Sequence, residues 1–174
     1  MKAKPNWRAL LLATCVLQAA DVRACWEDVG VKYGINPYLL YAIAKTESGL
    51  NPRAVNRANR NGSYDVGLMQ INSSWFPTLA RFGITERELY EPCVAIDVGA
   101  WILSQNMSRL GQTWDAVGAY NAADETRRLN YARKVFRNLP EGLRPGAGPC
   151  RLRPVPATKK QASVQPTARI APCD

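Results

Sequence analysis

Between residues 25 and 139, apolar residues recur at helical spacing in short stretches separated by glycine, proline and asparagine. Few stretches show the alternation of apolar and polar residues that is typical of a half-buried strand. A chain with this pattern lacks the strands for a large sheet, so it must bury several short helices against one another. The pattern therefore predicts a mainly α-helical domain with a small loop or hairpin region.

Start and stop signals place the individual helices. Asn36 and Pro37 supply an N-cap and a first-turn proline for a helix over residues 37–48, and Gly49 ends that helix. Comparable signals bound the other predicted helices, which cover residues 25–33, 75–82, 85–90, 93–111, 114–120 and 130–138.

The first 24 residues have the composition of a secretory signal peptide. Basic residues precede an apolar run over residues 9–17, which is too short to span a bilayer. Val22 and Ala24 are small residues at the two positions that a signal peptidase inspects, so we expect cleavage before Cys25 and export to the periplasm. An uncleaved anchor or a lipid-modified Cys25 is the alternative, and Arg23 fits a lipid-attachment motif poorly.

Most of the net charge of +9 lies in the two ends of the chain, and the region between them is nearly balanced. Residues 140–174 are rich in Pro, Gly, Lys, Arg and Ala and lack apolar periodicity, which predicts a flexible C-terminal tail. The basic residues have no interleaved aromatic residues, so we expect no nucleic-acid partner. A basic tail suits anionic cell-wall polymers, phospholipid or an acidic protein.

Removal of the signal peptide would leave four cysteines, an even number that suits an oxidising compartment. Four cysteines allow three pairings. We favour Cys25–Cys93, which would join the start of the domain to its middle, and Cys150–Cys173, which would close a loop in the tail.

The chain contains no histidine. This excludes Ser-His-Asp triads, Cys-His pairs, HExxH metalloproteases and most zinc hydrolases. No CxxC motif occurs either, so we predict no metal and no cofactor. If the protein is a hydrolase or lyase, its proton carriers must be carboxylates, Tyr, Lys or Cys.

Glu47 is the first candidate for such a carrier. On a helical wheel it falls in the centre of the apolar stripe that contains Leu40, Ile43 and Ala44, at the last turn of the predicted helix. Desolvation and the negative end of the helix dipole both disfavour an ionised carboxylate there, so we expect a raised pKa that suits a general acid. The alternative is a glutamate that reaches solvent or pairs with Arg53.

Asp65 is the second candidate. It lies in a segment over residues 51–67 that is rich in Asn, Gly and Arg and predicts a loop or small hairpin. A carboxylate in such a polar loop should stay ionised, so Glu47 and Asp65 could flank one bond in opposite protonation states, the pattern known from lysozyme. The alternative is an Asp that caps a turn.

Four motifs resemble the soluble lytic transglycosylase family, which is goose-lysozyme-like. They occur in the family's order and read Thr-Glu-Ser-Gly-Leu-Asn-Pro at residues 46–52, Gly-Leu-Met-Gln-Ile-Asn at 67–72, Ala-Tyr-Asn-Ala at 119–122 and Tyr-Ala-Arg-Lys-Val at 131–135. Cys25-Trp26 and Pro92-Cys93 match the small exported members that serve secretion, conjugation or pilus machines. That match supports the pairing of Cys25 with Cys93.

The resemblance implies a lysozyme-like domain over residues 25–139 that binds peptidoglycan glycan strands and serves such a machine. We expect a monomer whose basic tail contacts the machine. It implies that Glu47 is the essential acid and base, which first protonates the bond between N-acetylmuramic acid and N-acetylglucosamine and then activates the muramyl 6-hydroxyl. The implied substrate-binding residues are Ser48, Met69, Gln70, Tyr120, Asn121 and Tyr131.

Two positions depart from the family pattern. Ala123 stands where the family usually has Gly after Tyr-Asn-Ala, and Asp65 is more typical of hen-type lysozymes. Two further functions therefore stay open, a water-using muramidase in which Asp65 takes part and a non-catalytic peptidoglycan-binding scaffold.

Overall fold

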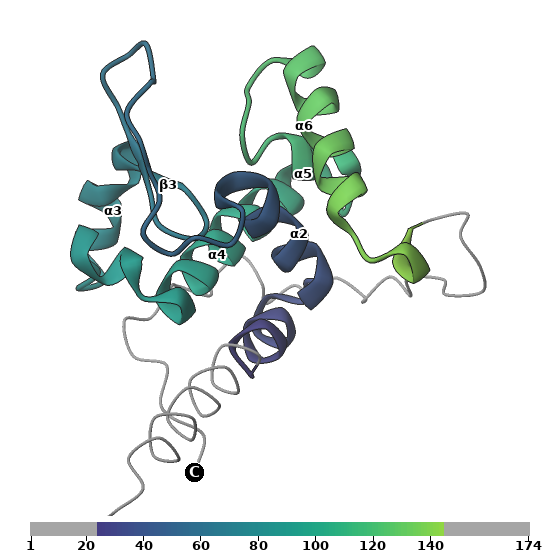
Figure 1. Ribbon diagram of the computed structural model, residues 1–174, viewed down its shortest axis with the longest axis horizontal. Coiled ribbons are helices and arrows are strands. Elements are labelled where there is room, and N and C mark those ends of the chain that lie inside the picture. The colour runs from purple at the N-terminus through teal and green to yellow at the C-terminus, as the bar shows by residue number, and fades with distance from the viewer. Residues whose placement is uncertain (1–23, 145–174) are drawn as a thin grey trace, which may run out of the picture.

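The computed structural model describes residues 24–144 and confirms a mainly α-helical fold with a small sheet (Figure 1). The predicted signal peptide, the tail beyond residue 144 and the Cys150–Cys173 pair lie outside the described residues. Within the described range, no helix is long and apolar enough to cross a membrane. A helical segment at residues 24–33 is followed by α2 (Pro37–Ser48), β1 (Val55–Asn56), β2 (Asp65–Val66), β3 (Ile71–Asn72), η1 (Ser73–Trp75), α3 (Phe76–Ala80), η2 (Glu86–Tyr90), α4 (Pro92–Leu110), α5 (Trp114–Gly118), α6 (Glu125–Asn138) and η3 (Glu141–Leu143).

Helix α2 has the predicted boundaries. The side chain of Asn36 accepts a hydrogen bond of 2.9 Å from the backbone N–H of Tyr38, and Gly49 ends the helix in the left-handed conformation. Leu40, Ile43 and the alanines between and beside them are completely buried. The apolar stripe thus faces the core, and the last turn of α2 carries Glu47 to the edge of that core.

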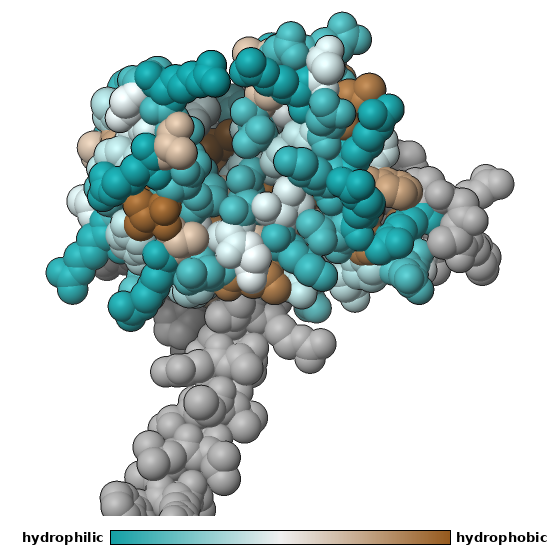
Figure 2. All heavy atoms as spheres, turned by 45° about the horizontal axis from the view of Figure 1, so that its top comes forward, coloured by the Kyte–Doolittle hydropathy of each residue, from teal (hydrophilic) through white to brown (hydrophobic). Residues whose placement is uncertain are grey.

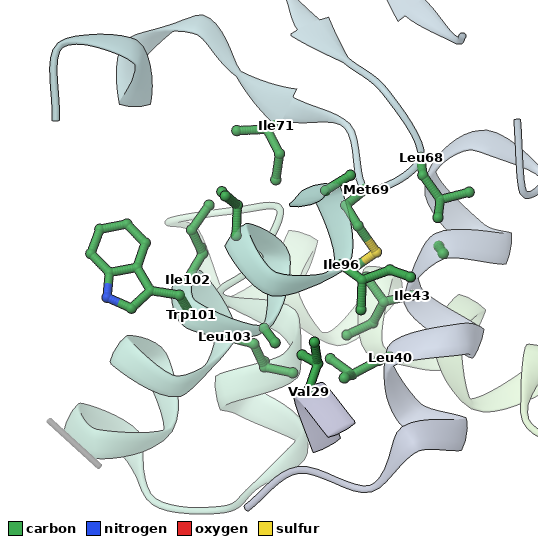
Figure 3. Packing of buried hydrophobic residues seen from close by; sticks show 14 of the residues in the cluster. Val29, Leu40, Ile43, Leu68, Met69, Ile71, Ile96, Trp101, Ile102 and Leu103 are labelled. Carbon is green, nitrogen blue, oxygen red and sulfur yellow. The ribbon is translucent and has the colours of Figure 1, made fainter. Parts of the chain in front are cut away.

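Helix α4 forms the centre of the domain, and every residue from Val94 to Leu103 is buried. Figure 3 shows Ile96 on α4 beside Ile43 of α2 and Met69 of the loop before β3. A Cβ added at Gly99 would lie 2.6 Å from Cε of Met69, so this glycine allows the loop to approach the helix closely.

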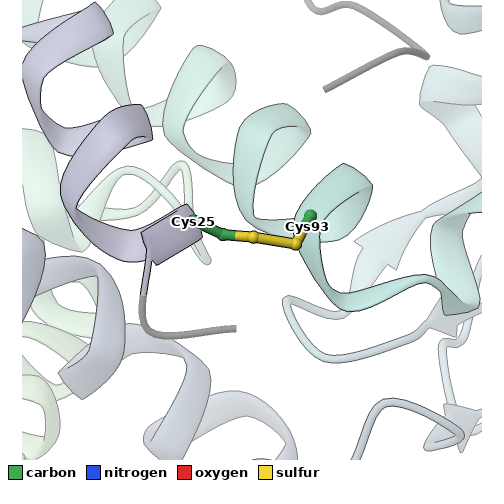
Figure 4. Close-up of a disulfide and its surroundings, with 2 residues drawn as sticks. All are labelled: Cys25 and Cys93. Carbon is green, nitrogen blue, oxygen red and sulfur yellow. A yellow bond between two sulfur atoms is a disulfide. The ribbon is translucent and has the colours of Figure 1, made fainter. Parts of the chain in front are cut away.

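The disulfide between Cys25 and Cys93 joins the first helical segment to the start of α4 (Figure 4). The two Cα atoms are 5.5 Å apart, and 68 residues separate the cysteines in the chain. A crosslink over a loop of this length reduces the conformational entropy of the unfolded chain, so it stabilises the fold by roughly 4 kcal/mol.

The predicted loop or hairpin forms an antiparallel sheet in the order β1-β2-β3. Val55 pairs with Val66, and Asp65 pairs with Asn72. The third strand was not predicted, because a two-residue strand leaves no periodic signal. Gly67 adopts φ +76° directly after β2, and a Cβ there would collide with the carbonyl oxygen of Leu89.

Several predicted helix boundaries or types were wrong, and α5, for example, ends at Gly118, two residues before the predicted end. Helix α6 begins at Glu125, five residues before the predicted start, because Asp124 caps it by accepting a hydrogen bond of 3.0 Å from the N–H of Arg127. Its first turn is polar and exposed, so apolar periodicity begins only at Tyr131. The predicted helix over residues 75–82 begins in the 3₁₀ turn η1, and the one over 85–90 is the 3₁₀ helix η2.

Candidate active site

A polar cleft of about 890 Å³ lies between the sheet on one side and the ends of α2 and α5 with the start of α6 on the other. In Figure 2 hydrophilic side chains gather on both sides of this hollow. Both predicted carboxylates line the cleft. The full lining is Glu47, Asn56, Ala58, Asn59, Arg60, Asn61, Ser63, Asp65, Gln70, Ile71, Asn72, Trp75, Ile102, Tyr120, Asn121 and Arg127.

Glu47 is half-buried, and its Oε1 accepts a hydrogen bond of 2.6 Å from the hydroxyl of Tyr131. Burial raises the pKa of Glu47 from 4.5 to about 7, and the charge of Asp65 adds to this rise. The hydrogen bond from Tyr131 and the charge of Lys134 act in the opposite direction. Glu47 is therefore protonated over much of the range up to neutral pH, as a general acid must be, and it does not pair with Arg53.

Two stacked tyrosines lie close to Glu47. The rings of Tyr120 and Tyr131 are 6.4 Å apart at 16°, and the hydroxyl of Tyr120 donates to the carbonyl oxygen of Met69 over 3.0 Å. Burial raises the pKa of both phenols well above the usual value, and the nearby Glu47 contributes. Both hydroxyls therefore stay protonated and act as hydrogen-bond donors.

Asp65 lies on β2, and three asparagine amides hold its carboxylate. Oδ1 accepts a bond of 2.6 Å from Asn72, while Oδ2 accepts from Asn59 at 2.9 Å and from Asn56 at 3.1 Å. The antiparallel register places Asn56 and Asn72 on the two strands that flank Asp65. Sequence reasoning missed these asparagines. Their density in and after residues 51–67 was the available signal, and it was interpreted only as a sign of turns.

The loop from Gly67 to Gln70 forms the floor beside Glu47. Gln70 has φ +48°, and its Nε2 donates to the carbonyl oxygens of Gly67 (2.9 Å) and Ala54 (3.2 Å). The hydroxyl of Ser48 donates to the carbonyl oxygen of Leu68 over 2.7 Å. These bonds fix the loop to the end of α2 and to the strand region, so the positions of Glu47 and Gln70 are coupled.

The structure brings together five predicted site residues in the cleft lining: Glu47, Asp65, Gln70, Tyr120 and Asn121. Within the described chain, the other three do not line it. Met69 is 0% exposed and packs in the core, Tyr131 is 6% exposed behind Glu47, and Ser48 uses its hydroxyl to hold the loop. Each of these three forms a hydrogen bond to a cleft residue or to the loop beside it, and the bond of Tyr131 to Glu47 is the one that the resemblance implies.

Comparison with known proteins identifies the family of the chain. The model of the family described as "Transglycosylase SLT domain" matches residues 24–137. The chain belongs to this family. It is 44% identical to "Invasion protein IagB" of Salmonella typhimurium (strain SL1344) over 119 residues, which are 66% of this chain and 74% of that protein.

Two further relatives of this transglycosylase-family protein cover a comparable share of the chain. "Protein IpgF" of Shigella flexneri is 38% identical over 135 residues, 75% of this chain and 88% of that protein. A "Peptidoglycan-binding-like protein" of Escherichia coli O157:H7 is 40% identical over 124 residues, 65% of this chain and 74% of that protein. Family membership supports a lytic transglycosylase-type function that acts on peptidoglycan.

Proposed function

We propose that this transglycosylase-family protein cleaves the β-1,4 bond between N-acetylmuramic acid and N-acetylglucosamine without water, leaving a 1,6-anhydromuramyl end. The observation that carries the proposal is the environment of Glu47. Its carboxyl group lines a polar cleft of about 890 Å³, and its pKa is raised to about 7 mainly by burial. Such a group can both give and take a proton near neutral pH.

The first step transfers the proton of Glu47 to the glycosidic oxygen, so that the C1–O bond breaks and N-acetylglucosamine leaves with a free 4-hydroxyl. Tyr131 already donates to Oε1 of Glu47, which leaves Oε2 to carry the proton. The same phenol then stabilises the carboxylate that the first step creates. In the second step, this carboxylate takes the proton of the muramyl 6-hydroxyl while O6 forms the new bond to C1.

In this proposal, Asp65 stabilises the charge that develops on the sugar. Positive charge develops on C1 and the ring oxygen when the glycosidic bond breaks. Asp65 lines the same cleft, and its three asparagine donors hold the carboxylate in one place, so it can stabilise that charge. Gln70, Tyr120 and Asn121 line the cleft beside the two acids and would contact the sugars.

The presence of Asp65 in the cleft also favours a second candidate function, hydrolysis by a muramidase, because a second carboxylate is what hydrolytic glycosidases use. Products separate the two functions. The purified protein is incubated with peptidoglycan, and the released fragments are analysed by mass spectrometry, with Glu47→Gln as the control. We expect anhydro ends, which are lighter than reducing ends by one water. Reducing ends alone would replace the first proposal by the second.

We further propose that the protein is exported, with cleavage before Cys25, and opens peptidoglycan locally in the periplasm for an envelope-spanning secretion, conjugation or pilus machine. The name "Invasion protein" of the Salmonella relative supports such a setting. The machine would contact the basic tail at residues 140–174. N-terminal sequencing of the periplasmic protein tests the cleavage. Complementation of a deletion strain with Glu47→Gln tests catalysis, since a scaffold would retain full function.

A further inference from the structure

Two arginines line the cleft in addition to its acids. Arg60 lies in the connection between β1 and β2, and Arg127 lies in the first turn of α6. In Figure 1 that connection and the start of α6 stand on opposite sides of the upper part of the domain. Because both side chains line the one cleft, a strand bound in it has a guanidinium group on either side.

Neither guanidinium group has a polar partner within the described chain. Both residues are exposed, and no side-chain hydrogen bond or ion pair joins either to another residue between 24 and 144. Two neighbouring arginines, by contrast, do contact other residues. Arg128 bonds with Asp115 at 3.2 Å and with the carbonyl oxygen of Ala122, and the guanidinium carbon of Arg57 lies 4.7 Å from the ring centre of Tyr64.

Neither acid of the cleft forms an ion pair with these two arginines in the described part of the chain. Asp65 is occupied by three asparagine amides, and Glu47 is tied to Tyr131 with its pKa raised to about 7. The lining of the cleft thus contains two exposed planar cations, each of which can bind a carboxylate through paired N–H donors. The glycan backbone is uncharged. The carboxylates of peptidoglycan sit on the O3 substituents of muramic acid, as the lactyl group itself or as the peptide attached to it.

We propose that Arg60 and Arg127 bind carboxylates on the O3 substituents of muramic acid residues on either side of the bond to be cleaved, and so give the protein a preference for acidic, peptide-bearing strands. This inference rests on the proposed function, because it takes a glycan strand as the occupant of the cleft. It adds a specificity determinant on two segments that none of the four sequence motifs contains.

Binding to an uncleaved strand is the direct test. The Glu47→Gln protein is titrated with soluble peptidoglycan strands in three forms: native peptide-bearing strands, strands whose carboxylates are amidated with carbodiimide and ammonia, and peptide-free strands that keep only the lactyl carboxylate. The same titrations are run with Arg60→Gln, Arg127→Gln and both changes added. Arg137→Gln, on the exposed last turn of α6, is the matched control.

Each arginine substitution should weaken binding of native strands about fivefold, and the double substitution about 25-fold. Amidated strands should bind to the Glu47→Gln protein as weakly as native strands bind to the doubly substituted one, with no further loss in the variants. In native strands the lactyl carboxyl group forms the amide bond to the peptide, so the carboxylates bound there belong to the peptide, and peptide-free strands should bind more weakly. Equal affinity for native and peptide-free strands would overturn the preference for peptide-bearing strands.

Equal losses on native and amidated strands, or an equal loss in Arg137→Gln, would overturn the inference. So would a Glu47→Gln protein that binds native and amidated strands alike. The proposed function fails separately, if the unsubstituted protein releases no fragment from native strands. The two failures are therefore distinguishable.

Discussion

The two sides of the cleft hold a carboxyl group each, in opposite environments. On the helical side, Glu47 ends an apolar stripe and has one phenol donor, and burial raises its pKa to about 7. On the sheet side, Asp65 lies between two strands and accepts from three amides. Apolar packing disfavours the charged form of Glu47, whereas the three amides hold the carboxyl group of Asp65 in one position.

This difference shows how one small domain can place two carboxyl groups in contrasting environments in the same cleft. The helix contributes desolvation, because its other side chains face the core. The sheet contributes donors, because its antiparallel register sets side chains from three strands side by side. Substitutions on either side of the cleft test this difference.

Replacement of Glu47 by Gln should have the largest effect. Removal of the acid should lower kcat about 10³-fold or more. Because the pKa of Glu47 is higher in the folded state, the native protein loses stability as pH rises from about 4.5 to about 7. The variant should therefore be more stable above pH 7 by on the order of 1–2 kcal/mol, after allowance for the solvent that reaches a half-buried group.

Urea unfolding at pH 8 and pH 4 measures this gain, which should vanish at pH 4. A variant that is inactive and also less stable at pH 8 would contradict the assignment of Glu47 as a desolvated acid.

Replacement of Asp65 by Asn should come next, with a loss in kcat of roughly tenfold to hundredfold through lost charge stabilisation. The charge of Asp65 raises the pKa of Glu47, so its removal should also shift the alkaline limb of the kcat/KM profile to lower pH. Glu141→Gln, an exposed charge removal outside the cleft, is the control. Unchanged turnover with an unshifted profile would remove Asp65 from the mechanism.

Replacement of Asn59 by Ala should lower kcat roughly threefold to tenfold, because one of the donors that hold Asp65 is lost while its charge remains. Asn61→Ala is the matched control, since Asn61 lines the same cleft but hydrogen-bonds Ser63 instead of Asp65. Steady-state kinetics on soluble strands compares the two variants. Equal losses of kcat in the two variants would mean that the three asparagine donors around Asp65 have no special role in catalysis.

Replacement of Tyr131 by Phe should have the smallest effect on rate, roughly twofold to fivefold. The diagnostic result for this variant is the direction in which the alkaline limb of the kcat/KM profile moves. The hydrogen bond from Tyr131 lowers the pKa of Glu47, so its loss should move the alkaline limb to higher pH, opposite to the shift for Asp65→Asn. Tyr38→Phe, an exposed phenol on α2, is the control. If the alkaline limb moved in the same direction for Tyr131→Phe and Asp65→Asn, the opposite effects that we assign to the two residues would be contradicted.

Local sequence patterns predicted much of the helical side. The boundaries of α2 follow from a cap, a proline and a glycine, and the wheel placed Glu47 on the apolar face, because a helix relates residues three and four apart. The same reasoning failed for the start of α6. There, capping by Asp124 decides the boundary, and the polar first turn gives no periodic signal.

What the sequence alone determined was the helical class, the boundaries of α2 and the position of an acid on an apolar face, since all of these depend on neighbours within one or two turns. Only the tertiary structure decided that three asparagines surround Asp65, that Met69 and Ser48 support the floor, and that Arg60 faces the same cleft as Arg127. These contacts join residues that are distant in the chain or lie in irregular segments. They arise when strands pair and when the sheet and helices pack on α4, and no local periodicity encodes them.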